Sequence, residues 1–385
     1  MHFMNVTPRE NLLKVLKGAR PSWIPITGHC DPYNQPSKKD MNPELAKALE
    51  NVQWGDESTI IFSRSLGLDI ADWCTSRIKE RHRKANVNSQ KDAQGRVVTT
   101  WQTPKGELRR VQQYSADTGM YYTVEHEVKE RNDLARLACV FEDTEYYLTP
   151  EDRELHRARR QLIGDDGIML CPISGTPLGQ MIRVHAGVET TAYLWADARK
   201  EMHDLFRVME ETHRRMLDLV LSCENDAIVT VDDTSTTTIS PDMFAEFCLG
   251  YTDRMADIVH AAGRFYFHHS CGLIKDLLAL YRQTRMDAVH GFTIPPIGNV
   301  TVAEGRKLLG PDITIMAGPD VCLQVNSGHR AEAARGIETL FRDAVPGSRF
   351  IMGLSAEPIN TMEGLMFIVQ ECRKYQRMYS ERNQP

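Results

Sequence analysis

The sequence has no long hydrophobic run and no excess of positive charge. No window of its 385 residues approaches the roughly 18 apolar residues needed to span a bilayer. The formal net charge is -6, so the basic surface of a nucleic-acid or acidic-membrane binder is missing. The N-terminal residues lack the apolar stretch and small-residue cleavage site of a secretory signal. We therefore expect a soluble, cytoplasmic globular protein without a nucleic-acid or membrane partner.

Several cofactor and catalytic motifs are also missing. The nine cysteines are odd in number, scattered and without a C-x-x-C pair, which favours reduced thiols over a disulfide framework. Neither a G-x-G-x-x-G nor a P-loop phosphate cradle occurs, and there is no G-x-S-x-G elbow and no H-E-x-x-H. The sequence therefore disfavours nucleotide-dependent chemistry and serine hydrolysis.

What the sequence does contain is a regular alternation of short apolar runs and helical patterns. The runs occupy residues 23–28, 58–63, 167–175, 227–233, 264–271, 287–292, 313–320 and 349–356. Continuous apolar runs are typical of buried parallel strands, and eight strands alternating with helices suit a (β/α)8 barrel. We predict an α/β fold, a single (β/α)8 TIM-barrel domain over residues 1–385. Residues 80–160 break the rhythm, and we interpret them as a β-hairpin and helical insertion after strand 2, with the hairpin turn at 104–106.

Polar, titratable and thiol side chains gather where the predicted strands end. In a (β/α)8 barrel the active site is built at the C-terminal ends of the strands, so these residues predict a functional mouth. Taken singly, each one is also explained as a hydrogen-bonded strand terminus. They are His29, Cys30, Ser174, Asp232, Asp233, His269, Cys271, His290, Asp320, Cys322 and Glu357.

The sharpest local signal is the sequence HHSCG at 268–272. Residues at i and i+2 of a strand share a face, so we expect His269 and Cys271 to converge. Imidazole and thiolate suit Zn²⁺, but a catalytic zinc needs about three protein ligands. We expect the third ligand from Cys322 or Glu357, with Cys30 as a further candidate. The alternative is a His and a Cys that simply pack at the barrel rim.

The Asp232–Asp233 pair allows several interpretations. The two carboxylates could form a general acid–base couple, bind a cationic substrate or orient metal ligands. They could equally cap the following loop, TSTTTIS, through Asx-type hydrogen bonds. The sequence leaves these alternatives open.

Five blocks of the sequence resemble the uroporphyrinogen decarboxylase superfamily. They are TPRENLLKVLKGARPSWIPI, AIVTVDDTSTTTISPDMFAEFCLGYTDRMADIVHAAG, HHSCGLIKDLLALY, GNVTVAEGRKLLGPDITIMAG and FIMGLSAEPINTMEGL, in that order. The resemblance covers nearly the whole chain and implies a (β/α)8 barrel, the fold reached above from the strand count.

Within this superfamily the resemblance favours the corrinoid-dependent methyltransferases. True decarboxylases carry an Arg-rich segment after the first strand that binds the substrate carboxylates, whereas this sequence reads TGHCDPYN there, with no arginine from Ile26 to Lys38. In the methyltransferases an H-x-C on the fifth strand and a later Cys hold zinc, and HSCG at 269–272 matches the first part. The stretch TTWQTPKGEL at 99–108 is similar to an insertion in relatives that transfer methyl groups. The family's third zinc ligand, a Cys expected near 353–357, is replaced here by the sequence GLSAE.

The resemblance implies a zinc-assisted, corrinoid-dependent methyltransferase that moves a methyl group between a small O-, N- or S-methylated substrate and a corrinoid, or from a methyl-corrinoid to an acceptor. The cobalamin-type corrinoid would be carried by a separate corrinoid protein, and relatives are monomers or homodimers. Two alternatives are a metal-independent decarboxylase of a smaller acid and a non-catalytic small-molecule binding barrel. The predicted roles are catalytic for Asp232, Asp233 and His290, substrate-binding for His29, Cys30, Ser174 and Asp320, and metal-binding for His269, Cys271, Cys322 and Glu357.

Overall fold

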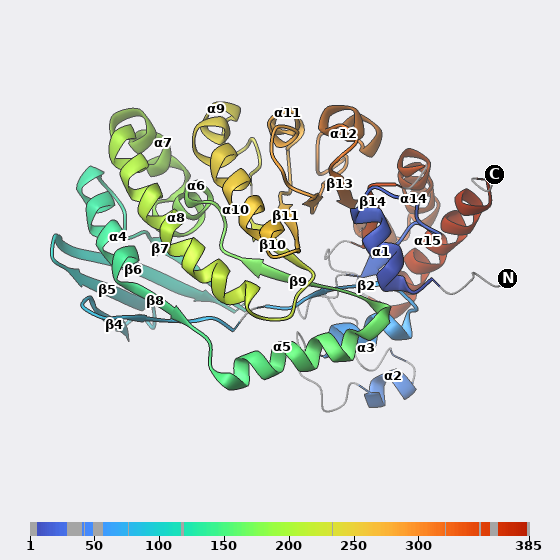
Figure 1. The fold of residues 1–385 in the computed structure, drawn as a ribbon, viewed down its shortest axis with the longest axis horizontal. Helices are drawn as coiled ribbons and strands as arrows, with labels where there is room; N and C mark the ends of the chain where they lie inside the picture. Colours follow the sequence, from blue (N-terminus) through green and yellow to red (C-terminus); the bar gives the residue numbers. More distant parts are fainter. Residues whose placement is uncertain are drawn as a thin grey trace.

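Eight parallel strands form the central sheet of the protein (Figure 1). The structure is a computed structural model that describes residues 6–28, 41, 43–48, 57–75, 77–116, 119–232, 234–319, 321–345, 348–354 and 361–382. Around the sheet the strand order is β1-β14-β13-β12-β11-β10-β9-β2. The strands are β1 (Ile26–Gly28), β2 (Ile70–Trp73), β9 (Gly167–Ile173), β10 (Ala227–Val231), β11 (Phe265–His269), β12 (Ala288–His290), β13 (Thr314–Ala317) and β14 (Phe350–Leu354).

Asp69 joins the two edges of this sheet. Its backbone N–H donates to the Ile26 carbonyl at 2.9 Å, and Thr27 and Asp69 form a parallel bridge. Its carboxylate also accepts from the Ile26 backbone N–H at 2.9 Å, and burial raises the pKa of this carboxyl to about 6. The sheet is thereby closed between β1 and β2, and the predicted (β/α)8 barrel is confirmed.

Helices surround the barrel, as Figure 1 shows. None of those in the described ranges is long and apolar enough to cross a membrane. The α-helices are α1 (Pro8–Leu16), α2 (Pro43–Ala48), α3 (Ser58–Ser65), α4 (Arg131–Asp143), α5 (Pro150–Ile163), α6 (Pro177–Gln180), α7 (Gly187–Asp197), α8 (Arg199–Leu221), α9 (Pro241–Met243), α10 (Leu249–Ala261), α11 (Leu278–Tyr281), α12 (Val302–Leu309), α13 (Cys322–Asn326), α14 (Arg330–Ala344) and α15 (Met362–Arg382).

Helix α1 covers the N-terminal end of the barrel. A Thr7–Glu10 capping box and Pro8 at the first turn begin the helix. Arg9 then donates to the Gly167 carbonyl at the start of β9 and to the Asp226 carboxylate just before β10. Apolar side chains of α1 pack in one buried cluster with the inward-facing residues of the strands. The opposite end, where the strands finish, is the one left to form a mouth.

The second strand is not where the sequence predicted it. Residues 58–63 (STIIFS) belong to helix α3, and the strand is β2 at Ile70–Trp73. Sequence periodicity overlooked β2 because Asp69 and Asp72 interrupt its apolar run. Both carboxylates are buried and paired, Asp69 as described above and Asp72 with Arg159 of α5, so the strand tolerates them. The apolar run in α3 has a strand-like composition, and its helical form shows that tertiary packing decided the outcome.

The insertion after β2 is larger than a hairpin. The predicted hairpin is present as β5 (Val97–Thr103) and β6 (Gly106–Ser115), and Gly106 at their turn has a φ of 123°. Strands β4 (Asn86–Lys91) and β7 (Met120–Glu125) extend it to a four-stranded antiparallel sheet, at the left in Figure 1. Strands β3 (Lys79–His82) and β8 (Thr144–Tyr147) pair separately. Helices α4 and α5 complete the insertion, and α5 returns the chain to β9.

Candidate functional site

Three rings meet at the C-terminal end of the barrel. Trp73 ends β2, His269 ends β11 and His290 ends β12. The indole of Trp73 lies 5.0 Å from the His290 ring centroid and 6.2 Å from that of His269. These side chains continue the inward-facing rows of their strands, because residues of alternate parity face the barrel interior. The site is therefore an aromatic and imidazole cluster at the mouth.

The two histidines share one hydrogen bond. They are register partners on neighbouring parallel strands, so their side chains lie on the same face, and their Nδ1 atoms are 2.7 Å apart. At this separation one Nδ1 carries a proton and the other accepts it. Gly291, with a φ of 74°, makes room for the pair, because a Cβ there would lie 2.7 Å from Cε1 of His269. The mouth thus holds a proton in a defined position between two imidazoles.

Cys271 and Ser174 lie just past the strands that precede them. Strand β11 ends at His269, two residues before Cys271, so the strand alternation that predicted a common face does not extend to Cys271. Its side chain is half-buried. Ser174 follows β9, is also half-buried, and lies with its Oγ 3.8 Å from the Met216 sulfur. Both residues are at the end of the barrel that holds the ring cluster, and their predicted roles stay predictions.

Asp232 lies on the outer side of the barrel wall. It is fully buried, and its Oδ2 accepts from the Thr176 backbone N–H at 3.1 Å, beside the first turn of α6. Gly179 of α6 approaches so closely that a Cβ there would lie 1.6 Å from Asp232 Oδ1. This carboxylate contacts a helix N-terminus, where negative charge is favourable. The arrangement suits a positioning role between β10 and α6, and a catalytic role for Asp232 stays a prediction.

Of the six remaining predicted site residues, one lies within the described ranges and five lie outside them. Cys322 is buried at the start of α13, within the main hydrophobic cluster. The residues outside the described ranges are His29, Cys30, Asp233, Asp320 and Glu357.

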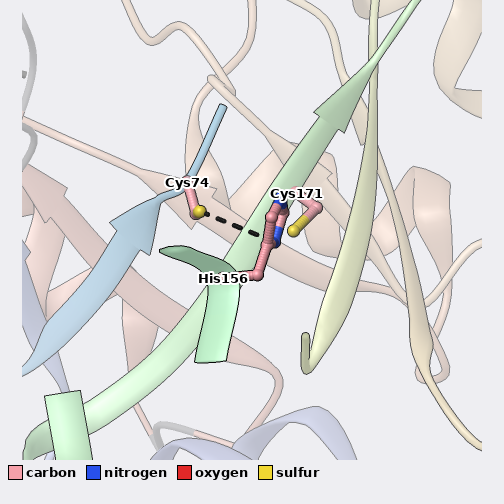
Figure 2. Close-up of side chains that lie close together, drawn as sticks. All are labelled: Cys74, His156 and Cys171. Atoms are coloured by element: carbon pink, nitrogen blue, oxygen red, sulfur yellow. Dashed lines mark hydrogen bonds between the residues drawn. The ribbon is translucent and has the colours of Figure 1, made fainter. Parts of the chain in front are cut away.

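A second cluster of chemically active side chains lies outside the barrel, between the sheet and α5 (Figure 2). Cys74 follows β2, Cys171 is in β9 and His156 is in α5, and Figure 2 shows the three side chains pointing toward one another. Their ligand atoms all lie within 4.8 Å of one another, and Cys74 Sγ is 3.9 Å from His156 Nδ1. In the part of the chain that the structure describes, this is the single group of three or more His, Cys, Asp or Glu side chains so close together.

The surroundings of this cluster favour a thiolate at Cys74. Its hydrogen bond with Cys171, followed by its contact with His156, lowers the pKa of the Cys74 thiol to about 5. The same hydrogen bond, together with burial, raises the pKa of Cys171 well above its usual value. Nearby, Arg159 of α5 holds Asp72 of β2 through two hydrogen bonds of 2.5 and 2.8 Å. A proton is thus shared unequally between two adjacent sulfurs.

Sequence reasoning missed Trp73, Cys74 and His156. Trp73 and Cys74 were overlooked because β2 was assigned to residues 58–63, and His156 lies in the insertion, where no strand-end rule applies. The signal that could have found Trp73 and Cys74 is the stretch LDIADWC, a short run that is apolar except for two aspartates and ends in a cysteine.

The sequence pattern of one family, described as uroporphyrinogen decarboxylase (URO-D), matches residues 124–322, just over half of the chain. A search of curated proteins finds no match.

Two solved structures have similar folds. A methyltransferase from Methanosarcina mazei superposes with a TM-score of 0.58 at 13% identity, covering 96% of this chain and 99% of the other. A B12-independent methionine synthase from Shewanella sp. W3-18-1, solved in complex with selenomethionine, gives a TM-score of 0.46 at 8% identity, covering 94% and 98%. The likeness to the first of these structures supports the barrel fold.

Proposed function

Because the chain belongs to the uroporphyrinogen decarboxylase family, we propose that its barrel mouth transfers a methyl group between a small methylated molecule and a corrinoid carried by a partner protein. The observation that carries this proposal is the hydrogen-bonded pair His269–His290, packed on Trp73 at the ends of three strands. The Methanosarcina mazei neighbour is itself described as a methyltransferase. A mouth of this kind offers a flat apolar wall and a positioned proton.

The residues that follow the first strand do not suit the decarboxylation of uroporphyrinogen, the reaction for which the family is named. Uroporphyrinogen carries many carboxylates, and no arginine occurs between Ile26 and Lys38 to bind them. Lysine occurs there only at the very end of this stretch. A substrate with less negative charge is therefore the better match.

The protein's own residues would act on the heteroatom that loses the methyl group. In the demethylating direction the bond between the methyl carbon and the heteroatom breaks, and both electrons stay on the heteroatom. The corrinoid supplies the metal centre that accepts the methyl group. We assign the protonation of the released heteroatom, which would otherwise leave as an anion, to the His269–His290 pair when one of its rings is an imidazolium. The imidazolium gives up one proton, and both rings are left neutral and joined by the hydrogen bond between their Nδ1 atoms. Trp73 would exclude water from this side of the mouth.

Zinc at the mouth is a narrower part of the proposal. His269 and Cys271 have the donor chemistry of zinc ligands, and a bound zinc would polarise the heteroatom as a Lewis acid. Among the described residues a third zinc ligand is missing at the mouth, because no three-ligand group there includes His269 or Cys271. Cys322 is buried in α13, and Cys30 and Glu357 lie beyond the described ranges. The proton step above does not depend on this ion.

An anaerobic assay tests the proposed activity. The protein is mixed with cob(I)alamin and a panel of O-, N- and S-methyl compounds, and methyl transfer is followed by the change in the corrinoid absorption spectrum. We expect turnover that requires the corrinoid and falls at least tenfold in His290→Ala. Cys139→Ala changes a half-buried thiol in α4, a helix of the insertion, and is the matched control for which we expect unchanged turnover.

Two other results would overturn the proposal. Release of carbon dioxide from a small acid, without corrinoid or metal, would make the protein a decarboxylase. Tight binding of a small molecule without any turnover would make it a binding barrel.

A further inference from the structure

The cluster of Cys74, His156 and Cys171 has the spacing of a metal site. In a tetrahedral zinc centre with Zn–S near 2.3 Å and Zn–N near 2.05 Å, sulfur and nitrogen ligands lie about 3.6 Å apart. Cys74 Sγ and His156 Nδ1 are 3.9 Å apart, and all three ligand atoms lie within 4.8 Å of one another. The Cys74–His156 pair would need a shift of about 0.3 Å to reach bonding geometry, and the other two pairs would need at most about 1 Å.

Rigid elements hold these ligands in place. Trp73 and Leu170 are register partners on β2 and β9, and the Cys74 N–H donates to the Leu170 carbonyl at 2.8 Å, so Cys74 and Cys171 lie side by side. The Asp72–Arg159 ion pair fixes α5 against the same strand. Arg159 lies three residues after His156 and so shares its helix face. Asp72 lies two residues before Cys74 and shares its side of the strand.

His156 is buried without the hydrogen bonds that a buried imidazole ordinarily makes. It is 1% exposed, and its Nε2 has no hydrogen-bond partner in the described structure. The polar contact of its other nitrogen is the Cys74 sulfur at 3.9 Å, a weak interaction. A metal bound at Nδ1 would replace this weak sulfur contact with a coordinate bond.

We propose that Cys74, His156 and Cys171 form a structural zinc site on the outer face of the barrel. Two thiolates balance the charge of Zn²⁺, so the buried centre is neutral. The exposed fractions of 2%, 1% and 0% leave no open face for substrate, which distinguishes a structural from a catalytic zinc.

This site is independent of the proposed methyl transfer and acts on a different part of the fold. It would join α5 of the insertion to β2 and β9 of the barrel. Trp73 immediately precedes Cys74 in the chain. The ion would therefore also stabilise the position of an aromatic side chain at the mouth.

Metal content, rather than activity, tests the site. The purified full-length chain is stripped with a chelator, reloaded with zinc, and compared with two double variants, Cys74→Ala with Cys171→Ala and His269→Ala with Cys271→Ala. Cys372→Ala, which removes another fully buried thiol in α15, is the matched control. We expect the first double variant to lose about one equivalent of zinc and the other proteins to retain it. Zinc content equal to the parent in the folded first variant would overturn the proposal.

A second measurement covers the case in which that variant does not fold. The His269→Ala, Cys271→Ala protein is loaded with zinc, and its X-ray absorption at the zinc edge is recorded. Sulfur ligands together with a nitrogen are expected, because the outer site remains intact. An absence of bound zinc, or a zinc coordination shell of oxygen and nitrogen alone, would refute the assignment of the outer site. This result does not depend on whether the mouth binds zinc.

Discussion

Replacing Gly291 by alanine should disturb the histidine pair more than it disturbs the fold. A Cβ at this position would lie 2.7 Å from Cε1 and 2.9 Å from Nδ1 of His269. Non-bonded carbon atoms are most stable about 3.5–4.0 Å apart, so the ring would have to move by about 0.8 Å or more. Because the contact atoms all belong to the imidazole side chain and not to the backbone, the ring can move.

The consequence for the pair follows from its present geometry. The Nδ1 atoms of His269 and His290 are 2.7 Å apart. Moving one ring away by about 0.8 Å would take the pair beyond the roughly 2.7–3.2 Å range of a hydrogen bond. A misplacement of about 1 Å near a reaction centre can cost on the order of 100-fold in rate. We expect kcat/KM for methyl transfer to fall by about 10- to 100-fold in Gly291→Ala.

Gly263→Ala provides the control for backbone strain. Gly263 has a φ of 70°, close to the 74° of Gly291, and a Cβ there meets nothing within 4 Å. Both variants should lose about 1–2 kcal/mol of stability, because an L-residue is strained in the left-handed region. Denaturant titration measures this loss, and NMR of the imidazole N–H protons reports the His269–His290 hydrogen bond. Equal turnover in the two variants, or an intact N–H signal in Gly291→Ala, would refute the reasoning.

Three further predictions concern the barrel wall. Arg159→Leu should cost about 3–5 kcal/mol because it leaves Asp72 charged and buried, and Asp72→Leu in the same chain should restore part of the loss, as measured by denaturant titration of the single and double variants. Gly179→Ala should lower the yield of folded protein far more than Gly263→Ala does, since its Cβ would lie 1.6 Å from Asp232 Oδ1; soluble expression and circular dichroism would show it. Burial lowers the pKa of His213 to about 3, so the unfolded state binds the proton more tightly and stability should fall as the pH drops from 6.5 toward 3, by up to about 1.4 kcal/mol per pH unit. His213→Gln should flatten this part of the stability profile, and an unchanged slope would contradict the assignment.

The barrel could be predicted from the sequence because seven of its strands lie within short, mainly apolar runs. In β9 and β10, for example, every residue from Gly167 to Cys171 and from Ala227 to Thr230 is buried. β2 could not be found in this way, because its carboxylates are stabilised by partners far away in the chain, such as Arg159 for Asp72. Local periodicity carries no information on such long-range pairing.

The mouth was predictable in part, because a barrel builds its site where the strands end. This rule placed His269 and His290 at one end of the barrel. The two residues are in contact because they are register partners on β11 and β12. The direction of Asp232 was not predictable, because β10 ends at Val231 and the carboxylate is directed by its contact with Thr176.

The alternation of side chains along β2 connects the mouth with the insertion. Trp73 faces the barrel interior, while its neighbours Asp72 and Cys74 face the outer layer. The chain leaves the barrel after β2 and returns at β9, the strand that pairs with β2. Helix α5, which leads into β9, therefore lies over both strands. His156 and Arg159 of α5 are therefore able to contact Cys74 and Asp72 at the same time. Any change in the insertion that moves α5 acts on this short strand, and through it on the indole at the mouth.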